Sequence, residues 1–325
     1  KELAATGRKC LIVGMGGLGK TELLRQLIRV CEEEQIVDKI AIVPYEGDII
    51  QSFARSFPGF QRQAPEESFR SILRRLTKEG KQSRVLLLID NLTNSPETDP
   101  ELKKLLSLPC SILISSRRNC MEGMETYLLE QPSISIGSLI FRDNYGRQLS
   151  PDDKEYLSEM LVNEALCHPL TLRLMASAAR NKDWSVQELK TQLARKVTLS
   201  WQENYQTVRM SQVYRQLYSY LHIPEDGRRL AELFTLLPRD SYSPEFLREW
   251  FPQCMGERAD EKLAALTEGG WLDRDETGFS MHPLIAQCLR RTVINQNHLL
   301  NCMRPIVERL GEMEWADIQL DGEEQ

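Results

Sequence analysis

Short hydrophobic runs alternate with amphipathic stretches over the first 140 residues of the chain. A brief apolar run bounded by polar residues is typical of a buried strand, whereas apolar residues that recur with helical spacing indicate a helix. Strands connected by helices predict a parallel sheet with helices on both faces, an α/β fold. The expected strands span residues 9–13, 40–43, 85–89, 112–114 and 134–136, and the expected helices follow Lys20 and span about 66–78 and 101–107.

The pattern changes after this first domain, which we assign to residues 1–141. Apolar positions then follow helical spacing without any strand run, as at Tyr156, Met160 and Leu161, and later at Leu189 and Leu193. This spacing predicts a small helical domain over residues 142–220.

Residues 221–295 combine helices with two short strand candidates. Helices followed by a two-stranded hairpin predict a winged-helix domain. The helices are expected at 229–237, 244–250 and 262–268, and after the Gly269-Gly270 turn the strands are expected at 271–272 and 279–281. The segment 299–310 again has a helical pattern, and we assign 296–325 to the helical start of a truncated C-terminal region.

Composition bounds the class of protein. The chain has 325 residues, of which 41% are hydrophobic and 27% charged, as in an ordinary globular protein of about two or three domains. It contains neither an apolar run of the ~20 residues that cross a bilayer nor a signal peptide, so we expect a cytoplasmic location and no membrane partner. The eight cysteines form no C-x-x-C pair and are expected to be reduced. Because the first residue is Lys1 rather than Met, we expect missing domains on both sides of the sequence.

A complete phosphate-loop motif, G-x-x-x-x-G-K-[ST], follows the first expected strand. Its glycines let the backbone turn several N–H groups toward a phosphate, and the next helix points its positive end at the anion. Lys20 supplies a cation for the terminal phosphates, and the Thr21 hydroxyl is a ligand for Mg²⁺. The nucleotide-binding residues expected here are Gly14, Met15, Gly16, Gly17, Leu18, Gly19, Lys20, Thr21 and Glu22.

An acidic residue ends the third expected strand. In phosphate-loop proteins an Asp at this place lies beside the magnesium, so we assign Asp90 to the metal site together with Thr21. The next residue is Asn91. Because an amide cannot take a proton from water, this position cannot act as a general base, and hydrolysis is expected to be slow.

Two arginines follow the fourth expected strand. A guanidinium at the carboxyl edge of a parallel sheet is suited to sense a γ-phosphate, so we group Arg117 with Lys20 and Asp90 as catalytic residues. The alternative is that Arg117 and Arg118 are solvated surface charges.

With these motifs the chain resembles the nucleotide-binding module of STAND ATPases of the NB-ARC type. This group includes plant disease-resistance receptors, apoptosome scaffolds and bacterial signalling proteins. The phosphate loop resembles the most frequent version of the group residue for residue, and Arg117 at the end of 114–117 matches the arginine of its Thr-Thr-Arg sensor motif.

Two later motifs extend the resemblance to about residue 290. Pro169 and Leu170, within 166–172, are similar to the end of the Gly-Leu-Pro-Leu motif, whose proline packs near the adenine. Residues 281–284 resemble the Met-His-Asp motif, whose histidine, here His282, contacts the β-phosphate of ADP. Taken singly, Pro169 could simply start a helix and His282 could be a core histidine.

The chain departs from the group at two of these motifs. Cys167 and His168 replace the Gly and the first Leu of Gly-Leu-Pro-Leu, and Pro283 replaces the Asp of Met-His-Asp. The packing around the adenine and the orientation of His282 are therefore expected to differ.

The resemblance implies a signalling switch with ADP or ATP and Mg²⁺ as cofactors. ADP would hold the resting state through His282, and ATP would engage Arg117, release the winged helix and allow self-association. An effector domain before Lys1 and a sensor domain after Gln325 would complete such a protein. The resemblance also implies a role in a defence response.

Three other functions are weighed against the switch. A constitutive ATPase motor remains an alternative function, although motors usually need an acid to activate water. A DNA-binding regulator is disfavoured, because 221–295 holds nine Lys and Arg against thirteen Asp and Glu and the net charge of the chain is −6. A GTPase would need Asn-Lys-x-Asp, and Asn181-Lys182-Asp183 has its acid one position early.

Overall fold

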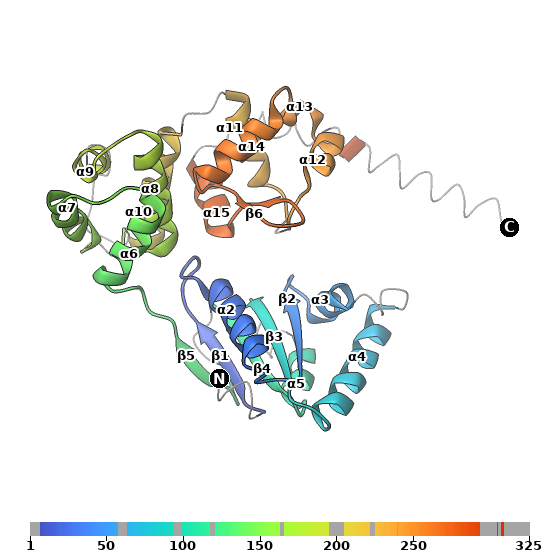
Figure 1. Ribbon diagram of the computed structural model, residues 1–325. Helices are drawn as coiled ribbons and strands as arrows, with labels where there is room; N and C mark the ends of the chain where they lie inside the picture. Colours follow the sequence, from blue (N-terminus) through green and yellow to red (C-terminus); the bar gives the residue numbers. More distant parts are fainter. Residues whose placement is uncertain are drawn as a thin grey trace. The chain divides into compact units, whose positions relative to one another are not determined.

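The computed structural model describes residues 7–57, 64–93, 99–117, 121–162, 166–194, 205–221, 225–238 and 240–292, with 304, 307 and 308. The chain forms two compact units, Lys1–Glu130 and Gln131–Gln325 (Figure 1). The first unit holds a parallel sheet and the second consists mainly of helices.

The sheet of the first unit has five parallel strands in the order β2-β3-β4-β1-β5. The four strands β1 to β4 confirm the first four expected strands. The fifth, β5, was not expected, because all four of its residues are exposed at the sheet edge and give no apolar run. The strands are β1 Lys9–Val13, β2 Lys39–Pro44, β3 Val85–Leu92, β4 Ser111–Ser116 and β5 Glu125–Leu128.

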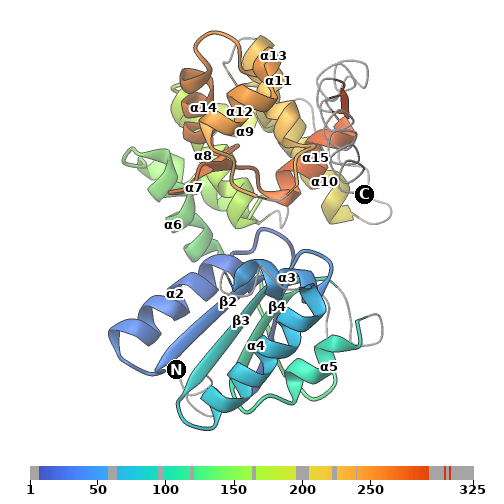
Figure 2. The ribbon, with the colours of Figure 1, turned by 90° about the vertical axis from the view of Figure 1, so that its right-hand side faces the viewer.

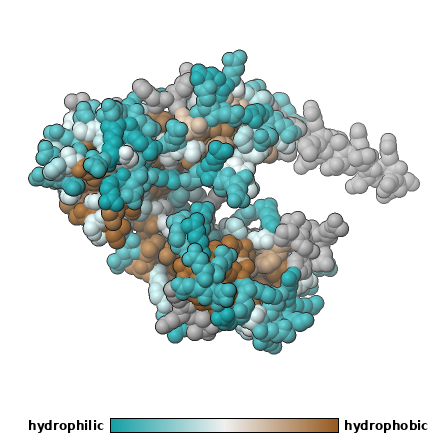
Figure 3. Space-filling view, in the orientation of Figure 1, coloured by the Kyte–Doolittle hydropathy of each residue, from teal (hydrophilic) through white to brown (hydrophobic). Residues whose placement is uncertain are grey.

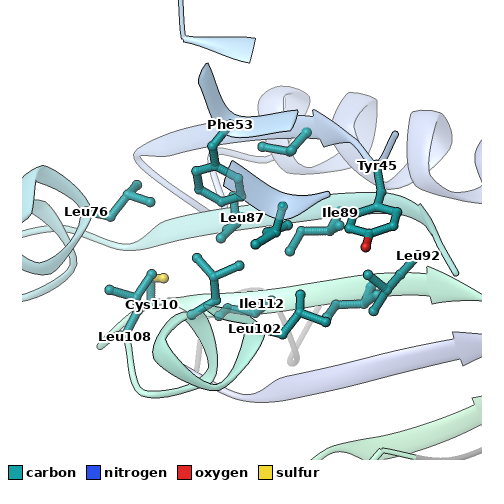
Figure 4. Close-up of a cluster of buried hydrophobic side chains, with 14 of the residues drawn as sticks. Tyr45, Phe53, Leu76, Leu87, Ile89, Leu92, Leu102, Leu108, Cys110 and Ile112 are labelled. Atoms are coloured by element: carbon teal, nitrogen blue, oxygen red, sulfur yellow. The ribbon is translucent and has the colours of Figure 1, made fainter. Parts of the chain in front are cut away.

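Helices cover both faces of this sheet, as the sequence predicts (Figure 2). Side chains on successive strand positions point to opposite faces. Leu86 and Leu88 therefore pack on the side of α2, whereas Leu87 and Ile89 pack with Phe53 on the side of α3, α4 and α5 (Figure 4). The helices are α2 Lys20–Glu33, α3 Ile49–Ser56, α4 Pro65–Gly80 and α5 Glu101–Leu106.

The prediction of a strand at 134–136 is wrong, because these residues begin helix α6, Ile134–Tyr145. The Ser133 side chain caps the helix by accepting a hydrogen bond from the Ile136 backbone N–H at 3.4 Å. The apolar-polar-apolar triplet imitates strand alternation, but the buried residues Gly137, Phe141 and Tyr145 follow the helical repeat. Ile134 and Ile136 remain exposed. Hydrophobic residues, in brown, reach the surface at several places in the space-filling view (Figure 3).

The second unit continues with a succession of helices and one small hairpin. Its elements are α7 Pro151–Leu161, α8 Pro169–Asn181, α9 Val186–Ala194, α10 Tyr205–Ser219, α11 Glu225–Phe234, α12 Pro244–Trp250, α13 Pro252–Met255, α14 Ala259–Glu268, β6 Asp273–Arg274, β7 Phe279–Ser280 and α15 Pro283–Thr292. Trp271 and Leu272 are buried but precede β6, so the expected strand at 271–272 is displaced by two residues. The boundaries 142–220 and 221–295 and the winged-helix assignment stay predictions. The segment expected to be helical at 299–310, with the region 296–325, lies almost wholly outside the described residues.

A tight turn joins the antiparallel strands β6 and β7. The Asp275 carboxylate accepts hydrogen bonds from the Thr277 hydroxyl and from the backbone N–H groups of Thr277 and Gly278. These bonds, led by that of the Thr277 hydroxyl, hold the pKa of Asp275 at about 2. Gly278 has φ +153°, and a Cβ there would lie 2.2 Å from the Tyr242 carbonyl oxygen, so only glycine fits.

Two arginines of α8 hold the segment from the end of α14 to the start of β6. Arg173 forms an ion pair with Asp273 at 2.7 Å and donates to the Gly270 carbonyl at 3.0 Å. Arg180, two turns further along α8, donates to the Glu268 carbonyl at 2.9 Å. We call this set of contacts the α8 clasp. It ties α8 to the hairpin region within the second unit.

Replacing Arg173 by alanine is expected to destabilise the protein by about 1–3 kcal/mol, since two charge-assisted hydrogen bonds are lost. The side chain is 31% exposed, so solvent screening keeps the effect toward the lower end. Urea denaturation followed by circular dichroism measures the change. Arg142→Ala removes an exposed pair with Asp143 and serves as the control, expected to cost less than about 1 kcal/mol. Equal losses in both variants would show that the clasp contributes no more than a surface pair.

Candidate functional site

The phosphate loop lies between β1 and α2, in the first unit. Gly17 and Gly19 have φ angles of 79° and 96°, in the left-handed region that glycine adopts without strain. Gly19 is the N-cap of α2 and offers no side chain to cap the helix, so the first turn of α2 presents its backbone N–H groups to the loop. Such a turn followed by a helix N-terminus is a binding site for anions.

Lys20 folds back over the loop. Its ammonium donates hydrogen bonds to the carbonyl oxygens of Gly14 at 2.6 Å and Met15 at 2.8 Å, and only 8% of the residue is exposed. The loop carbonyls thus hold a cation beside the glycine turn, where the phosphate-loop motif predicts phosphate binding.

Asp90 and Thr21 meet as expected for a metal site. The Thr21 hydroxyl donates to one oxygen of the Asp90 carboxylate at 2.8 Å. The other carboxylate oxygen accepts a short hydrogen bond from the Ser115 hydroxyl at the end of β4. Three side chains from α2, β3 and β4 therefore converge at the carboxyl edge of the sheet.

Arg117 reaches the loop from the end of β4. Its side chain is exposed, but its Nη2 lies 3.1 Å from where a Cβ on Gly16 would stand. Val13 pairs with Ser116 across β1 and β4, so the residue after Ser116 stands next to the start of the loop. The structure thus brings Arg117 to Gly16, whereas Arg118 lies outside the described residues.

These residues fit a nucleotide with Mg²⁺. The loop combines left-handed glycines, a helix N-terminus and the Lys20 cation, which together match a polyphosphate. Thr21 and Asp90 offer the hydroxyl and carboxylate oxygens that Mg²⁺ prefers. Glu22 differs from the other expected residues in that its side chain pairs with Arg25 and Gln26 on the surface of α2, which leaves its backbone as its route to a ligand.

Pro169, Leu170 and His282 belong to the second unit. Pro169 begins α8 after the N-cap His168, and Leu170 is 6% exposed in the core of that unit. The His282 Nδ1 accepts a hydrogen bond from the Leu284 backbone N–H at 3.1 Å. In the neutral ring the proton is therefore on Nε2, and the backbone orients the imidazole where the resemblance would have an Asp.

Two features of the site were missed by the sequence analysis. Ser115 belongs to no motif named above, although a serine on the strand next to an expected metal-binding Asp is a usable signal. Asn91 adopts the left-handed conformation with φ 64°, which no local pattern indicates.

Solved structures similar to this chain include two ATPases and a branch migration motor. A signal transduction ATPase with numerous domains (STAND) that has a tetratricopeptide repeat sensor, from Pyrococcus horikoshii, matches 95% of this chain and 44% of its own, with TM-score 0.57 and 14% identity. A Walker-type ATPase of Pyrococcus abyssi matches 86% and 90%, with TM-score 0.41 and 14% identity. The Holliday junction branch migration motor of Thermotoga maritima matches 87% and 87%, with TM-score 0.32 and 13% identity.

The fold is that of the P-loop NTPases, with a parallel sheet, helices on both faces and the phosphate loop after its first strand. This chain spans less than half the length of the Pyrococcus horikoshii STAND protein, at 44%. No protein-family model matches the sequence, and no curated protein does.

The described part of the chain lacks two kinds of feature. In the ranges given above, no helix has both the length and the apolar character that a bilayer crossing needs. The same ranges contain no group of three or more His, Cys, Asp or Glu residues suited to hold a metal ion. A Mg²⁺ site at Thr21 and Asp90 would be of another kind, because it would share its ion with the phosphates of a nucleotide.

Proposed function

We propose that the chain binds ADP or ATP with Mg²⁺ and acts as a signalling switch of the STAND type. The observation that carries the proposal is the convergence of Lys20, the Thr21–Asp90 pair and Arg117 around one glycine turn. Lys20 and the loop N–H groups would bind the phosphates, and Arg117 would distinguish a γ-phosphate from its absence.

Slow hydrolysis is the second part of the proposal. The bound Mg²⁺ would offset phosphate charge, and Thr21 and Asp90 would hold it. Asn91 follows Asp90, and its amide cannot take a proton from water. This position therefore offers no base to activate the attacking water. This favours a switch, which holds its nucleotide, over a motor, which turns over rapidly.

The third part concerns the second unit. We propose that Pro169 and Leu170 pack near the adenine and that His282 donates from Nε2 to the β-phosphate of ADP. The Leu284 N–H supports this role because it fixes the proton of the neutral ring on Nε2. ATP would replace this contact by that of Arg117, release the last helices and allow self-association, with effector and sensor domains outside this sequence.

One experiment tests the nucleotide directly. The purified protein is denatured and the released nucleotide is identified by chromatography, and steady-state phosphate release is measured in parallel. Trapped ADP with less than about one turnover per minute supports the switch. Many turnovers per minute would favour a motor, and salt-dependent binding to duplex DNA would favour a regulator.

Replacing His282 by alanine is expected to raise the dissociation rate of ADP about tenfold, because a hydrogen bond to a charged phosphate is lost, and to leave ATP binding nearly unchanged. Release of a fluorescent ADP analogue measures the rate. His168→Ala removes the fully buried histidine that precedes α8 in the other motif and serves as a comparison for effects on folding. Equal weakening of ADP and ATP binding in the His282 variant would rule out the proposed switch contact.

A further inference from the structure

Strand β3 contains a bulge at the residue that the metal site uses. Ile89 stands opposite Ile114 on β4, and Leu92 stands opposite Ser116, so two residues of β3 face the single residue Ser115. An extra residue of this kind bends the strand and turns a side chain to a new direction. Here the bulge directs Asp90 toward Thr21.

The bulge has a conformational cost and disrupts the ladder. Asn91 takes the left-handed conformation at φ 64°, which residues with a Cβ seldom adopt and which asparagine tolerates better than most. Its backbone N–H, displaced from regular pairing, donates instead to the Ser115 hydroxyl at 2.7 Å. A buried N–H without such a partner would be a further penalty.

Ser115 serves both residues of the bulge at once. A hydroxyl has one donor and two acceptor positions, so its oxygen can accept from Asn91 while its proton goes to Asp90. Ser115 is fully buried, at 0% exposed. Since Thr21 binds the second oxygen of Asp90, both oxygens of that carboxylate are held and its plane is fixed.

We propose that Ser115 is a positioning residue that holds the Asp90 carboxylate in the orientation needed to bind Mg²⁺ with the nucleotide. This inference rests on the proposed nucleotide-binding function. Ser115 itself touches neither nucleotide nor metal in this role and acts through Asp90. Partners that orient a metal-binding carboxylate typically change metal affinity 10–100-fold when they are removed.

The neighbouring Ser116 offers a matched control. It lies on the same strand, is 1% exposed and also bonds to β3, since its hydroxyl donates to the Leu92 carbonyl at 2.9 Å. A role limited to joining the two strands would make Ser115 and Ser116 equivalent. A role in orienting Asp90 belongs to Ser115 alone.

The test compares Ser115→Ala, Ser115→Thr and Ser116→Ala in the full chain with a fluorescent ADP analogue as probe. The affinity is measured in excess EDTA and in a Mg²⁺ titration. In Ser115→Ala the half-saturating Mg²⁺ concentration should rise about tenfold, while the affinity in EDTA stays within about twofold of the wild type. Ser115→Thr keeps the hydroxyl and should restore most of the Mg²⁺ response, and Ser116→Ala should leave it unchanged.

Several results would overturn the proposal. Equal losses with and without Mg²⁺ in Ser115→Ala, or an equal shift in Ser116→Ala, would reduce Ser115 to a strand contact. If Ser115→Ala does not fold, Ser115→Cys carries the test, because the thiol has a similar shape but is a weak donor. A wild-type protein that binds no nucleotide in either condition would instead defeat the proposed function. A wild type that binds nucleotide with no response to Mg²⁺ would defeat this inference alone.

Discussion

Replacing Lys20 by alanine should weaken the binding of both ADP and ATP by at least about 100-fold, or roughly 3 kcal/mol. The reason is that Lys20 holds the cation of the phosphate loop, 2.6 Å from the Gly14 carbonyl and 2.8 Å from that of Met15. Removing it takes the lysine cation from the loop, so the backbone N–H groups and Mg²⁺ would have to offset most of the phosphate charge. Isothermal titration calorimetry or fluorescence anisotropy with a labelled nucleotide measures the loss.

The control for this variant is Lys39→Ala. Lys39 lies at the beginning of β2, is half-exposed and forms an ion pair with Glu79 of α4. Its replacement therefore removes a lysine of the same unit that lies outside the phosphate loop. Thermal unfolding of both variants checks that the fold is retained. Wild-type affinity in Lys20→Ala would mean that the loop does not bind the phosphates.

Replacing Leu87 by alanine should destabilise the protein by about 2–5 kcal/mol. Leu87 lies in the middle of β3, is 0% exposed and packs in the cluster between the sheet and the helices α3 to α5 (Figure 4). Its truncation removes buried apolar surface and leaves a cavity beneath the helices. Because β3 also carries Asp90, nucleotide binding by this variant should weaken under conditions in which the first unit begins to unfold. Urea denaturation measures the free energy of unfolding.

Leu23→Ala provides a chemically identical control. Leu23 lies on α2 and is 43% exposed, so its truncation should cost less than about 1 kcal/mol. Similar destabilisation by the two substitutions would mean that the cluster around Leu87 does not determine the stability of the first unit.

The sheet could be predicted from the sequence where burial leaves a continuous apolar run, as at 85–89. It could not be predicted where burial is absent, as in β5, or where a short apolar alternation belongs to a helix, as at Ile134. Periodicity over three residues cannot distinguish these cases, because the deciding contacts of Phe141 and Tyr145 come later in the chain.

The candidate site was predictable to the extent that it depends on local motifs. The loop, Asp90 and Arg117 follow from residue types at the ends of strands, and the parallel register of β1 and β4 then brings Arg117 to Gly16. The bulge at Asp90 and Asn91 depends on how β3 pairs with β4. Register between strands distant in sequence is not encoded in either strand alone, so the part played by Ser115 emerges only in the folded sheet.

The α8 clasp has a consequence for how a movement of α8 would affect the rest of the second unit. Helix α8 has thirteen residues and so extends about 20 Å, with Pro169 in its first turn and Arg180 in its last. Because α8 is hydrogen-bonded through both Arg173 and Arg180 to the segment from the end of α14 to the start of β6, it cannot tilt without moving that segment or breaking these bonds. A displacement of the Pro169 end would therefore also move the base of the hairpin at Asp273, as long as the Arg173 bonds hold.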